Sequence, residues 1–393
     1  RKIVMKHLIV RNIGPLREVD INIESINLII GLQSSGKSCV LKTACYCAWV
    51  EKRIELAQTA KEYENGTKFI DDLLSYYKMQ SYLSENSYIE YVTPYLQFSY
   101  DHKNKKFSFK WKSQRWKYKR PKVSYIPSDR NLVAAIPAWS KLSLDYDNLL
   151  DFMGDWDIAR KQTQAKENIL DLGMGYFYDA KTNSDQIRLK NGHIIRLTES
   201  SSGVQSLVPL IIHLEYLNHD LYLNQDGLPQ TFQSKEARKS LLSKLYNKVL
   251  REPSSSKDDF FVKSVDGVDF VFADSDQVNS FKNLAHNYLD YDHNEIFLEE
   301  PEDNLFPTTQ CQLVNWLLDS VMGAGRKDTL FIATHSPYIL NQLLKRRPKG
   351  MNLYFTHPVS AEGMFDVKSL SEEEFGEIYD NGVDLFFNFE AYV

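Results

Sequence analysis

Strands followed by a helix are predicted from the hydrophobic pattern of the first 57 residues. Residues 6–13 are predicted to form a strand, and residues 19–23 alternate between apolar and polar side chains, as in a strand with one buried face. Residues 26–30 are almost continuously apolar, which indicates a strand buried on both faces. From Lys37 to about Leu56 apolar residues recur at helical spacing, which predicts a helix.

Buried strands return near the end of the chain, at residues 296–298 and 330–333, after a more polar middle. That middle is predicted to hold helices over 58–86, antiparallel strands over 88–126, acid-rich helices over 140–172, a hairpin over 186–197 turning at Asn191-Gly192, an apolar-faced helix over 205–217, and a polar segment over 218–290 with a loop at 254–257. Buried strands at both ends predict one α/β core, split in the sequence, with a parallel sheet and insertions.

The most specific motif lies between the strand 26–30 and the helix after it. Residues 31–38, Gly-Leu-Gln-Ser-Ser-Gly-Lys-Ser, match G-x-x-x-x-G-K-[ST] in full. In such a P-loop the backbone N–H groups surround phosphates, Lys37 reaches the β- and γ-phosphates, and Ser38 offers a hydroxyl to Mg²⁺. The residues predicted to bind the nucleotide here are Gly31, Gln33, Ser34, Ser35, Gly36, Lys37, Ser38 and Cys39.

Two later strands end in side chains that can act on a phosphate. The strand 296–298 runs into Glu299 and Glu300, which point in different directions because a strand alternates its faces. One carboxylate can hold Mg²⁺ while the other faces the attacking water; a solvated strand end is the alternative. The strand 330–333 leads to His335, whose imidazole can donate to a γ-phosphate or a catalytic water, or be structural.

A fourth motif, Ser-Ser-Ser-Gly-Val-Gln at residues 200–205, opens the apolar-faced helix. Ser202 and Gly203 at a helix start can bind an anion. An ordinary serine N-cap is the alternative.

Together and in this order, the four motifs resemble those of ABC-type ATPases, in the branch of RecF, SMC-like repair proteins and OLD-family ATPases. Residues 12–15, 299–302 and 333–337 also resemble that branch. The resemblance implies an α/β ABC ATPase core, with an antiparallel β-layer and an inserted helical lobe, that binds ATP and Mg²⁺ and forms ADP and phosphate. It implies metal binding by Ser38 and Glu299, a catalytic base at Glu300 and a switch at His335.

The resemblance also implies a head-to-tail homodimer, because Ser202, with Gly203 and Gln205, would serve a γ-phosphate bound by the partner subunit. Larger rings are compatible with such composite sites. Three positions depart from the family pattern: Val204 replaces a signature glycine, Glu299 stands where Asp is commoner, and the Q-loop glutamine is not evident. Ser128 or Asp129, after the strand 122–126, is the replacement that we expect.

Six segments follow from the predicted elements and the resemblance. They are 1–57, the ABC core with the P-loop; 58–87, a helical insertion; 88–130, an antiparallel β-layer with a basic face; 131–217, a helical lobe with the signature motif; 218–290, a variable insertion; and 291–393, the ABC core with the acidic strand and the His switch.

OLD nucleases carry a TOPRIM domain after the ATPase, whereas 58 residues follow His335 here, too few for one. Residues 384–389 are predicted to form a closing strand or a docking segment. ATPases of this build resemble those of two-gene bacterial anti-phage systems. The predicted function is a sensor ATPase that controls a separate effector, such as a nuclease; the alternative is a RecF-type or SMC-like DNA-repair ATPase.

The two proposed functions differ in what a basic and aromatic segment of the chain would bind. Ten Lys or Arg and no Asp or Glu lie between Lys103 and Lys122, although the whole chain has a net charge of -5. Phe107, Phe109 and Trp111 share one strand face, and Lys106, Lys110 and Lys112 share the other. The lysine face is predicted to bind DNA or a DNA-mimicking protein, or to protect an edge strand from aggregation.

Composition excludes several other classes. The 393 residues leave room for two or three structural units. No stretch approaches the ~18 apolar residues of a membrane span, so no membrane association is expected. Four cysteines in a chain of this length form no disulfide framework, and with no signal-peptide pattern they predict a cytoplasmic protein.

Overall fold

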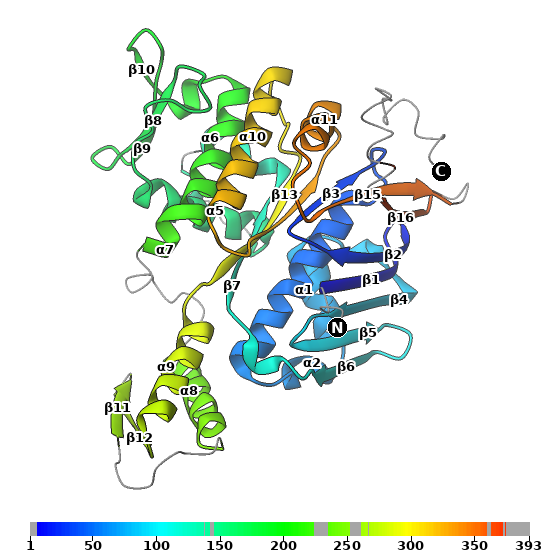
Figure 1. The fold of residues 1–393 in the computed structure, drawn as a ribbon. Helices are drawn as coiled ribbons and strands as arrows, with labels where there is room; N and C mark the ends of the chain where they lie inside the picture. The colour runs from blue at the N-terminus through cyan, green and yellow to red at the C-terminus, as the bar shows by residue number, and fades with distance from the viewer. Residues whose placement is uncertain are drawn as a thin grey trace.

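The computed structural model describes residues 6–136, 138–141, 145–223, 235–251, 261–265, 267–359, 363–371 and 374. An 11-stranded mixed sheet organises the fold (Figure 1). Its order is β6 (Lys106–Trp111), β5 (Leu96–Asp101), β4 (Leu83–Val92), β1 (Lys6–Ile13), β2 (Leu16–Ile23), β16 (Phe365–Leu370), β15 (Met351–Pro358), β3 (Ile26–Ile30), β14 (Thr329–Ala333), β13 (His293–Glu299) and β7 (Pro121–Ile126).

The strands from β15 to β7 form the parallel half of the sheet, which confirms the predicted α/β fold with a parallel core. The chain enters this half at β3, turns through the P-loop and continues as helix α1 (Lys37–Ala57). β14 lies between β3 and β13. The carboxyl ends of β3, β13 and β14 therefore share one edge of the sheet.

β7 corrects the prediction of antiparallel strands over 88–126. β4, β5 and β6 do pair antiparallel, but they extend the main sheet through β1. β7 instead runs parallel to β13, with Pro121 opposite His293 and Ile126 opposite Leu298. Helix α1 covers one face of β7 and helix α5 covers the other, as a strand of a parallel core requires.

Helices cover both faces of the sheet (Figure 1). α1, α2 (Lys61–Glu64) and α3 (Lys68–Tyr76) pack in one core, and α4 (Leu132–Ala135), α5 (Asn148–Gln162), α6 (Ser202–Glu215), α10 (Pro307–Gly323) and α11 (Pro337–Arg346) pack in the other. The predicted helix after Lys37 is confirmed. The α-helices predicted over 58–86 end at Tyr76, and the last residues of that range belong to a 3-10 turn and to β4, which begins at Leu83.

Further short turns connect these elements. They are 3-10 helices at Gln80–Tyr82, Arg115–Lys117, Ser128–Asn131, Trp139–Lys141 and Leu197–Glu199, and a π-helical turn at Tyr216–Asp220.

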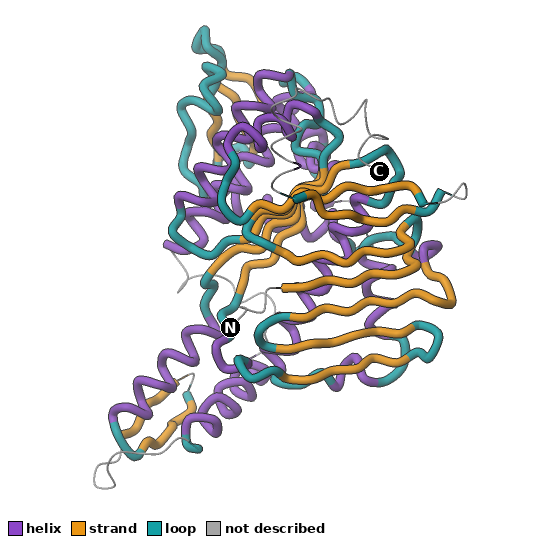
Figure 2. The backbone as a smooth tube through the Cα atoms, turned by 45° about the vertical axis from the view of Figure 1, so that its right-hand side comes forward, coloured by secondary structure: helices purple, strands orange, loops and turns teal. Residues whose placement is uncertain are grey.

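Two smaller sheets lie outside the main one. The predicted hairpin is confirmed as β9 (Ser184–Arg188) and β10 (Ile194–Arg196), and β8 (Gly175–Asp179) adds a third strand that the sequence pattern did not indicate. The segment 218–290 contains α7 (Leu221–Leu223), α8 (Lys235–Val249), α9 (Ser275–Leu289), β11 (Phe261–Val265) and β12 (Val268–Phe272). α8, α9 and the β11–β12 hairpin project from the body of the molecule around a small core that also includes Tyr118 (Figure 2). The loop 254–257 and the segment 384–389 lie outside the described residues.

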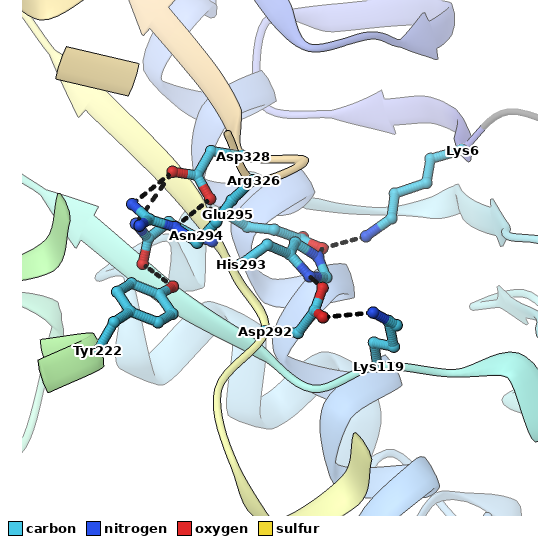
Figure 3. A network of polar contacts seen from close by, with 9 residues as sticks. All are labelled: Lys6, Lys119, Tyr222, Asp292, His293, Asn294, Glu295, Arg326 and Asp328. Carbon is cyan, nitrogen blue, oxygen red and sulfur yellow. Dashed lines mark hydrogen bonds and ion pairs between the residues drawn. The ribbon is translucent and has the colours of Figure 1, made fainter. Parts of the chain in front are cut away.

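Ion pairs and hydrogen bonds fix the beginning of β13 (Figure 3). Lys6 of β1 pairs with Glu295, and Lys119 pairs with Asp292 at 2.6 Å. On the other side Asp328 accepts the backbone N–H of Asn294 at 2.8 Å. These contacts hold the first residues of the strand that ends at Glu299.

None of the helices in the described part of the chain has both the length and the hydropathy that a membrane-spanning segment needs.

Candidate nucleotide-binding site

A cavity of about 290 Å³ lies between the end of β3 and the start of α1. We call it the P-loop cavity. Its walls include residues 33–38 of the motif and Cys39, but not Gly31, and also Glu300 and His335, which follow the ends of β13 and β14. The fold therefore brings three of the four sequence motifs to one place.

Lys37 lies at the centre of this arrangement and is only 4% exposed. Its ammonium donates to the carbonyl oxygens of Gly31 at 3.0 Å and Leu32 at 2.7 Å. Burial lowers the pKa of Lys37 to about 8, although Glu300 and Glu302 oppose the fall. An anion beside this ammonium would compensate for the lost hydration, which is the chemistry of a phosphate subsite.

The backbone of the loop suits the same ligand. Gly36 has φ of 92°, and a Cβ there would stand 2.6 Å from Leu16 Cδ2, so glycine is required. The first N–H groups of α1 have no intrahelical partner and face an incoming anion. Ser35 is buried and its hydroxyl donates to the Leu32 carbonyl at 2.6 Å. Burial raises the pKa of Cys39 to about 12, so its thiol contributes no charge.

Glu300 and His335 are in direct contact at the cavity wall. Glu300 Oε1 lies 3.2 Å from His335 Nε2, and this bond holds the pKa of Glu300 below its usual value. Burial raises the pKa of its neighbours Glu302 and Asp303, that of Asp303 to about 6. Glu300 is therefore the carboxylate of this loop that is best suited to remain ionised and accept a proton at neutral pH.

Glu299 points elsewhere, as the alternation of a strand requires. It is 5% exposed, and its Oε2 accepts the backbone N–H of Ser128 at 3.3 Å. Its Oε1 is buried and has no hydrogen-bond partner among the described residues. An orphaned carboxylate oxygen suits a cation or its water, although Glu299 is not among the described residues that line the P-loop cavity, whereas Ser38 is.

No group of three or more His, Cys, Asp or Glu side chains that could hold a metal occurs within the described ranges. Mg²⁺ at nucleotides does not require such a group, because one or two protein groups hold it together with waters and phosphates.

Arg130 holds the backbone of Glu299 and Glu300, and it was not among the residues predicted for the site. This fully buried guanidinium donates to the backbone carbonyls of Glu299 at 2.9 Å and Glu300 at 2.8 Å. Glu300 itself has φ of 40°, a strained conformation for a residue with a side chain. Arg130 therefore stabilises the sharp turn that aims the Glu300 side chain into the cavity. An arginine after Pro127, in a segment already singled out, was the available signal.

Other residues of the P-loop cavity also lacked a recognisable pattern. Lys42, Lys78 and Tyr82 line it, and Tyr82 is 40% exposed. Lys78 and Tyr82 come from the segment 58–87, which was predicted only as a helical insertion. The proposed Q-loop replacements, Ser128 and Asp129, are not among its lining residues; Ser128 acts through its backbone on Glu299.

The signature residues lie apart from the P-loop cavity. Ser202 is exposed at the start of α6, and Ser201 is the N-cap. Gly203 is tightly packed, since a Cβ there would stand 2.8 Å from the Asn304 carbonyl oxygen. Gln205 donates to the carbonyls of Thr198 and Ser200, both at 3.1 Å. Ser202, Gly203 and Gln205 do not appear among the described residues lining the cavity.

The basic segment is divided between surfaces. Lys106 and Lys110 are exposed on the edge strand β6, and Phe107 on its other face is buried. Asp101 lies directly opposite Lys106 in the register. Lys119 pairs with Asp292, and Lys122 pairs with Asp155 at 2.7 Å. The positive charge is therefore less concentrated in space than in sequence.

No protein-family model and no curated protein matches this sequence. Similar solved structures include the SMC head domain from Thermotoga maritima, with 10% identity and a TM-score of 0.43 over 93% of this chain and 98% of that chain. A Smc head domain from Pyrococcus furiosus, bound to the C-terminal domain of ScpA, has 8% identity and a TM-score of 0.40 over 96% and 99%. An ATP-binding cassette of an ABC transporter in its ADP conformation has 12% identity and a TM-score of 0.32 over 96% of each chain. These identities and TM-scores are low, so they show nothing of the function of this chain.

Proposed function

We propose that this chain is a Mg²⁺-dependent ABC-type ATPase. The observation that carries the proposal is the Glu300–His335 contact of 3.2 Å in the wall of the P-loop cavity that also contains Lys37. A phosphate-binding loop, an ionised carboxylate and an imidazole in one cavity are the groups that hydrolysis of a γ-phosphate needs. Release of phosphate from ATP by the purified chain, and its loss in the variants below, tests the proposal.

Each residue has a part in this reaction. Lys37 and the loop N–H groups bind and orient the β- and γ-phosphates. Mg²⁺, when held by Ser38 and Glu299, supplies positive charge that neutralises the phosphate oxygens. Glu300 takes a proton from the attacking water, and His335 orients Glu300 and stabilises its charge through their hydrogen bond. Arg130 holds the backbone turn that presents Glu300.

The exposed position of Ser202 supports a composite site formed by two copies, head to tail. In that arrangement the start of α6 of one copy, with Ser202, Gly203 and Gln205, would face the nucleotide bound by the other. A helix start offers unpaired N–H groups to a γ-phosphate. Larger rings of such dimers are compatible with this proposal.

Replacing Ser202 with Arg should block hydrolysis without weakening ATP binding to a single chain. The serine serves a nucleotide on the other copy, so a bulky cation there would disturb only the dimer. Mixing Ser202→Arg with Lys37→Ala should restore about one intact site per heterodimer, seen as recovered phosphate release. No recovery, when both proteins are folded and associate, would contradict the composite site. Ser202→Ala, which removes only the hydroxyl, is the matched milder variant.

We propose further that ATP occupancy or hydrolysis switches a separate effector, as in a bacterial anti-phage defence system in the cytoplasm. The support is the resemblance of the overall build of this chain to ATPases of two-gene anti-phage systems, in which a separate protein supplies the cleaving step. Expressing the chain with its neighbouring genes should reduce phage plaque formation, and Lys37→Ala should abolish that reduction. Equal protection by the variant would contradict a role for ATP.

A DNA-repair or DNA-structure ATPase is the second candidate, and the exposed lysines of β6 are the observation that favours it. If this face binds DNA or a DNA-mimicking protein, changing Lys106, Lys110 and Lys112 to Glu should abolish DNA-stimulated ATPase activity and leave the basal rate. The slope of log K against log salt should fall by about one unit for each lysine–phosphate interaction that the changes remove.

A matched control separates local from net charge. Lys181, Lys282 and Lys327 are exposed and lie outside β6 and the helix α2 that packs against it, and changing these three to Glu alters the net charge equally. If the β6 variant and the control both still bind DNA at low salt, the remaining role of these lysines is protection of an edge strand.

A further inference from the structure

A second cavity lies toward the other end of α1, away from the P-loop. It measures about 360 Å³, within the range of small-molecule sites. We call it the Lys52 cavity. α1, β7, α5 and α8 contribute to its walls, and no described residue lines both cavities. Lys37 begins α1 and Lys52 lies about four turns later, which is about 22 Å at 1.5 Å per residue. The two cavities are therefore separate sites on one helix.

Charged side chains of both signs line the Lys52 cavity. They are Lys52, Arg53, Arg120, Lys122, Glu62, Asp151 and Asp155. Arg53 pairs with Glu62 at 2.8 Å, and Lys122 pairs with Asp155 at 2.7 Å. Asp151 accepts hydroxyl groups from Tyr76 at 2.7 Å and Tyr146 at 3.4 Å. All three carboxylates thus have partners within the protein.

Two cations remain without a carboxylate. Lys52 makes no hydrogen bond or ion pair with any residue of the described ranges. Arg120 donates to two uncharged oxygens, the Leu289 carbonyl at 2.6 Å and the Tyr291 hydroxyl at 3.4 Å. Its Nε is buried and has no partner there. These groups leave unused donors beside the cavity.

The titration of neighbouring groups indicates a surplus of positive charge. Burial raises the pKa of Tyr291, but Lys52, Lys122 and Arg120 outweigh burial, and the pKa of this phenol falls below its usual value. Burial lowers the pKa of Lys52, Tyr291 and Asp155 oppose the fall, and Arg120 and Lys122 add to it. A bound anion would relieve this repulsion.

Aromatic rings form the other part of the wall. Trp49, Tyr125, Phe152 and Tyr291 all line the Lys52 cavity. The guanidinium of Arg120 already lies over the Tyr291 ring, 4.5 Å from its centroid. Planar rings favour planar ligands through stacking and edge contacts. Arg and Lys together favour a phosphate group, which Arg can bind through two parallel hydrogen bonds.

We propose that the Lys52 cavity binds a small ring-bearing phosphate monoester of nucleoside monophosphate size, with its phosphate between Lys52 and Arg120 and its ring against the aromatic wall. A phosphate monoester carries about −1.5 to −2 charges at neutral pH, which suits two cations without carboxylate partners. This site is independent of the proposed ATPase reaction.

Calorimetric titration of the Lys37→Ala variant tests the proposal, because that variant silences the P-loop. The probes are AMP, GMP, CMP, UMP and inorganic phosphate. At least one nucleotide should bind once per chain and at least tenfold more tightly than inorganic phosphate. Adding Lys52→Met should weaken that binding at least tenfold. Ser240→Trp, which fills the cavity from α8 without changing its charge, should also weaken it.

Two controls keep the outcome clear. Lys61→Met removes an exposed lysine of α2 that does not line the cavity, and it should leave binding unchanged. Lys52→Met alone should leave ATP binding at the P-loop unchanged. The proposal is overturned if none of the four nucleotides binds at millimolar concentration, if binding survives both Lys52→Met and Ser240→Trp, or if inorganic phosphate binds as tightly as every nucleotide.

Discussion

Lys37→Ala should weaken ATP binding by about 100-fold or more, which corresponds to roughly 2.7 kcal/mol or more, and should abolish hydrolysis. The ammonium is buried among the loop carbonyls of Gly31 and Leu32, and we propose that it is the cation that meets the β- and γ-phosphates. Charge-assisted hydrogen bonds of this kind are about twice as strong as neutral ones. Equilibrium titration with ATP, together with phosphate release, measures both effects.

Lys42→Ala is the matched control for position. Lys42 also lines the P-loop cavity, one turn further along α1. If placement of the ammonium matters rather than overall charge, Lys42→Ala should have a much smaller effect. Wild-type ATP affinity and turnover in a folded Lys37→Ala variant would refute the P-loop assignment.

Glu300→Gln should keep ATP binding and slow hydrolysis by about 10²-fold or more, the usual contribution of a general base. The amide cannot accept the proton of the attacking water, but it keeps the size of the side chain and a hydrogen bond to His335. ATP should therefore accumulate uncleaved on the protein. Single-turnover measurement of phosphate release separates this slow chemical step from slow product release.

Glu299→Gln discriminates between the two carboxylates. Glu299 accepts the backbone N–H of Ser128 and has an unpartnered buried oxygen. Its loss should therefore weaken Mg²⁺ binding, and so raise the Mg²⁺ concentration that hydrolysis requires, before it stops the chemical step. Trapping of ATP by Glu299→Gln, and not by Glu300→Gln, would reverse the roles that we assign to these residues.

Much of the fold follows from local sequence patterns. The bounds of β1 and β3 and the start of α1 were predicted within a residue, because strong hydrophobic runs meet the P-loop glycines there. β7 was misplaced because pairing partners are set by tertiary contacts: its six residues match an antiparallel or a parallel neighbour equally well. β8 has no strong alternation of its own and is completed by pairing with β9.

The candidate site likewise contains residues that the sequence pattern predicts and residues that it does not. Residues within a contiguous motif, such as Lys37 and Glu300, could be recognised from spacing. Arg130 could not, because its function depends on reaching the carbonyl oxygens of residues about 170 positions away. The basic segment shows the reverse case, because residues that are close in sequence lie far apart in the sheet. Lys106 and Lys122 are on its two opposite edge strands.

The central claim is an ATPase whose complete site needs two copies, and the molar mass of Glu300→Gln with nucleotide tests it most directly. Light scattering after size exclusion should give twice the mass of one chain with ATP and Mg²⁺. It should give a smaller mass with ADP, or when Lys37→Ala is added to Glu300→Gln. A variant that is saturated with ATP and keeps the same mass in all three conditions would contradict the account.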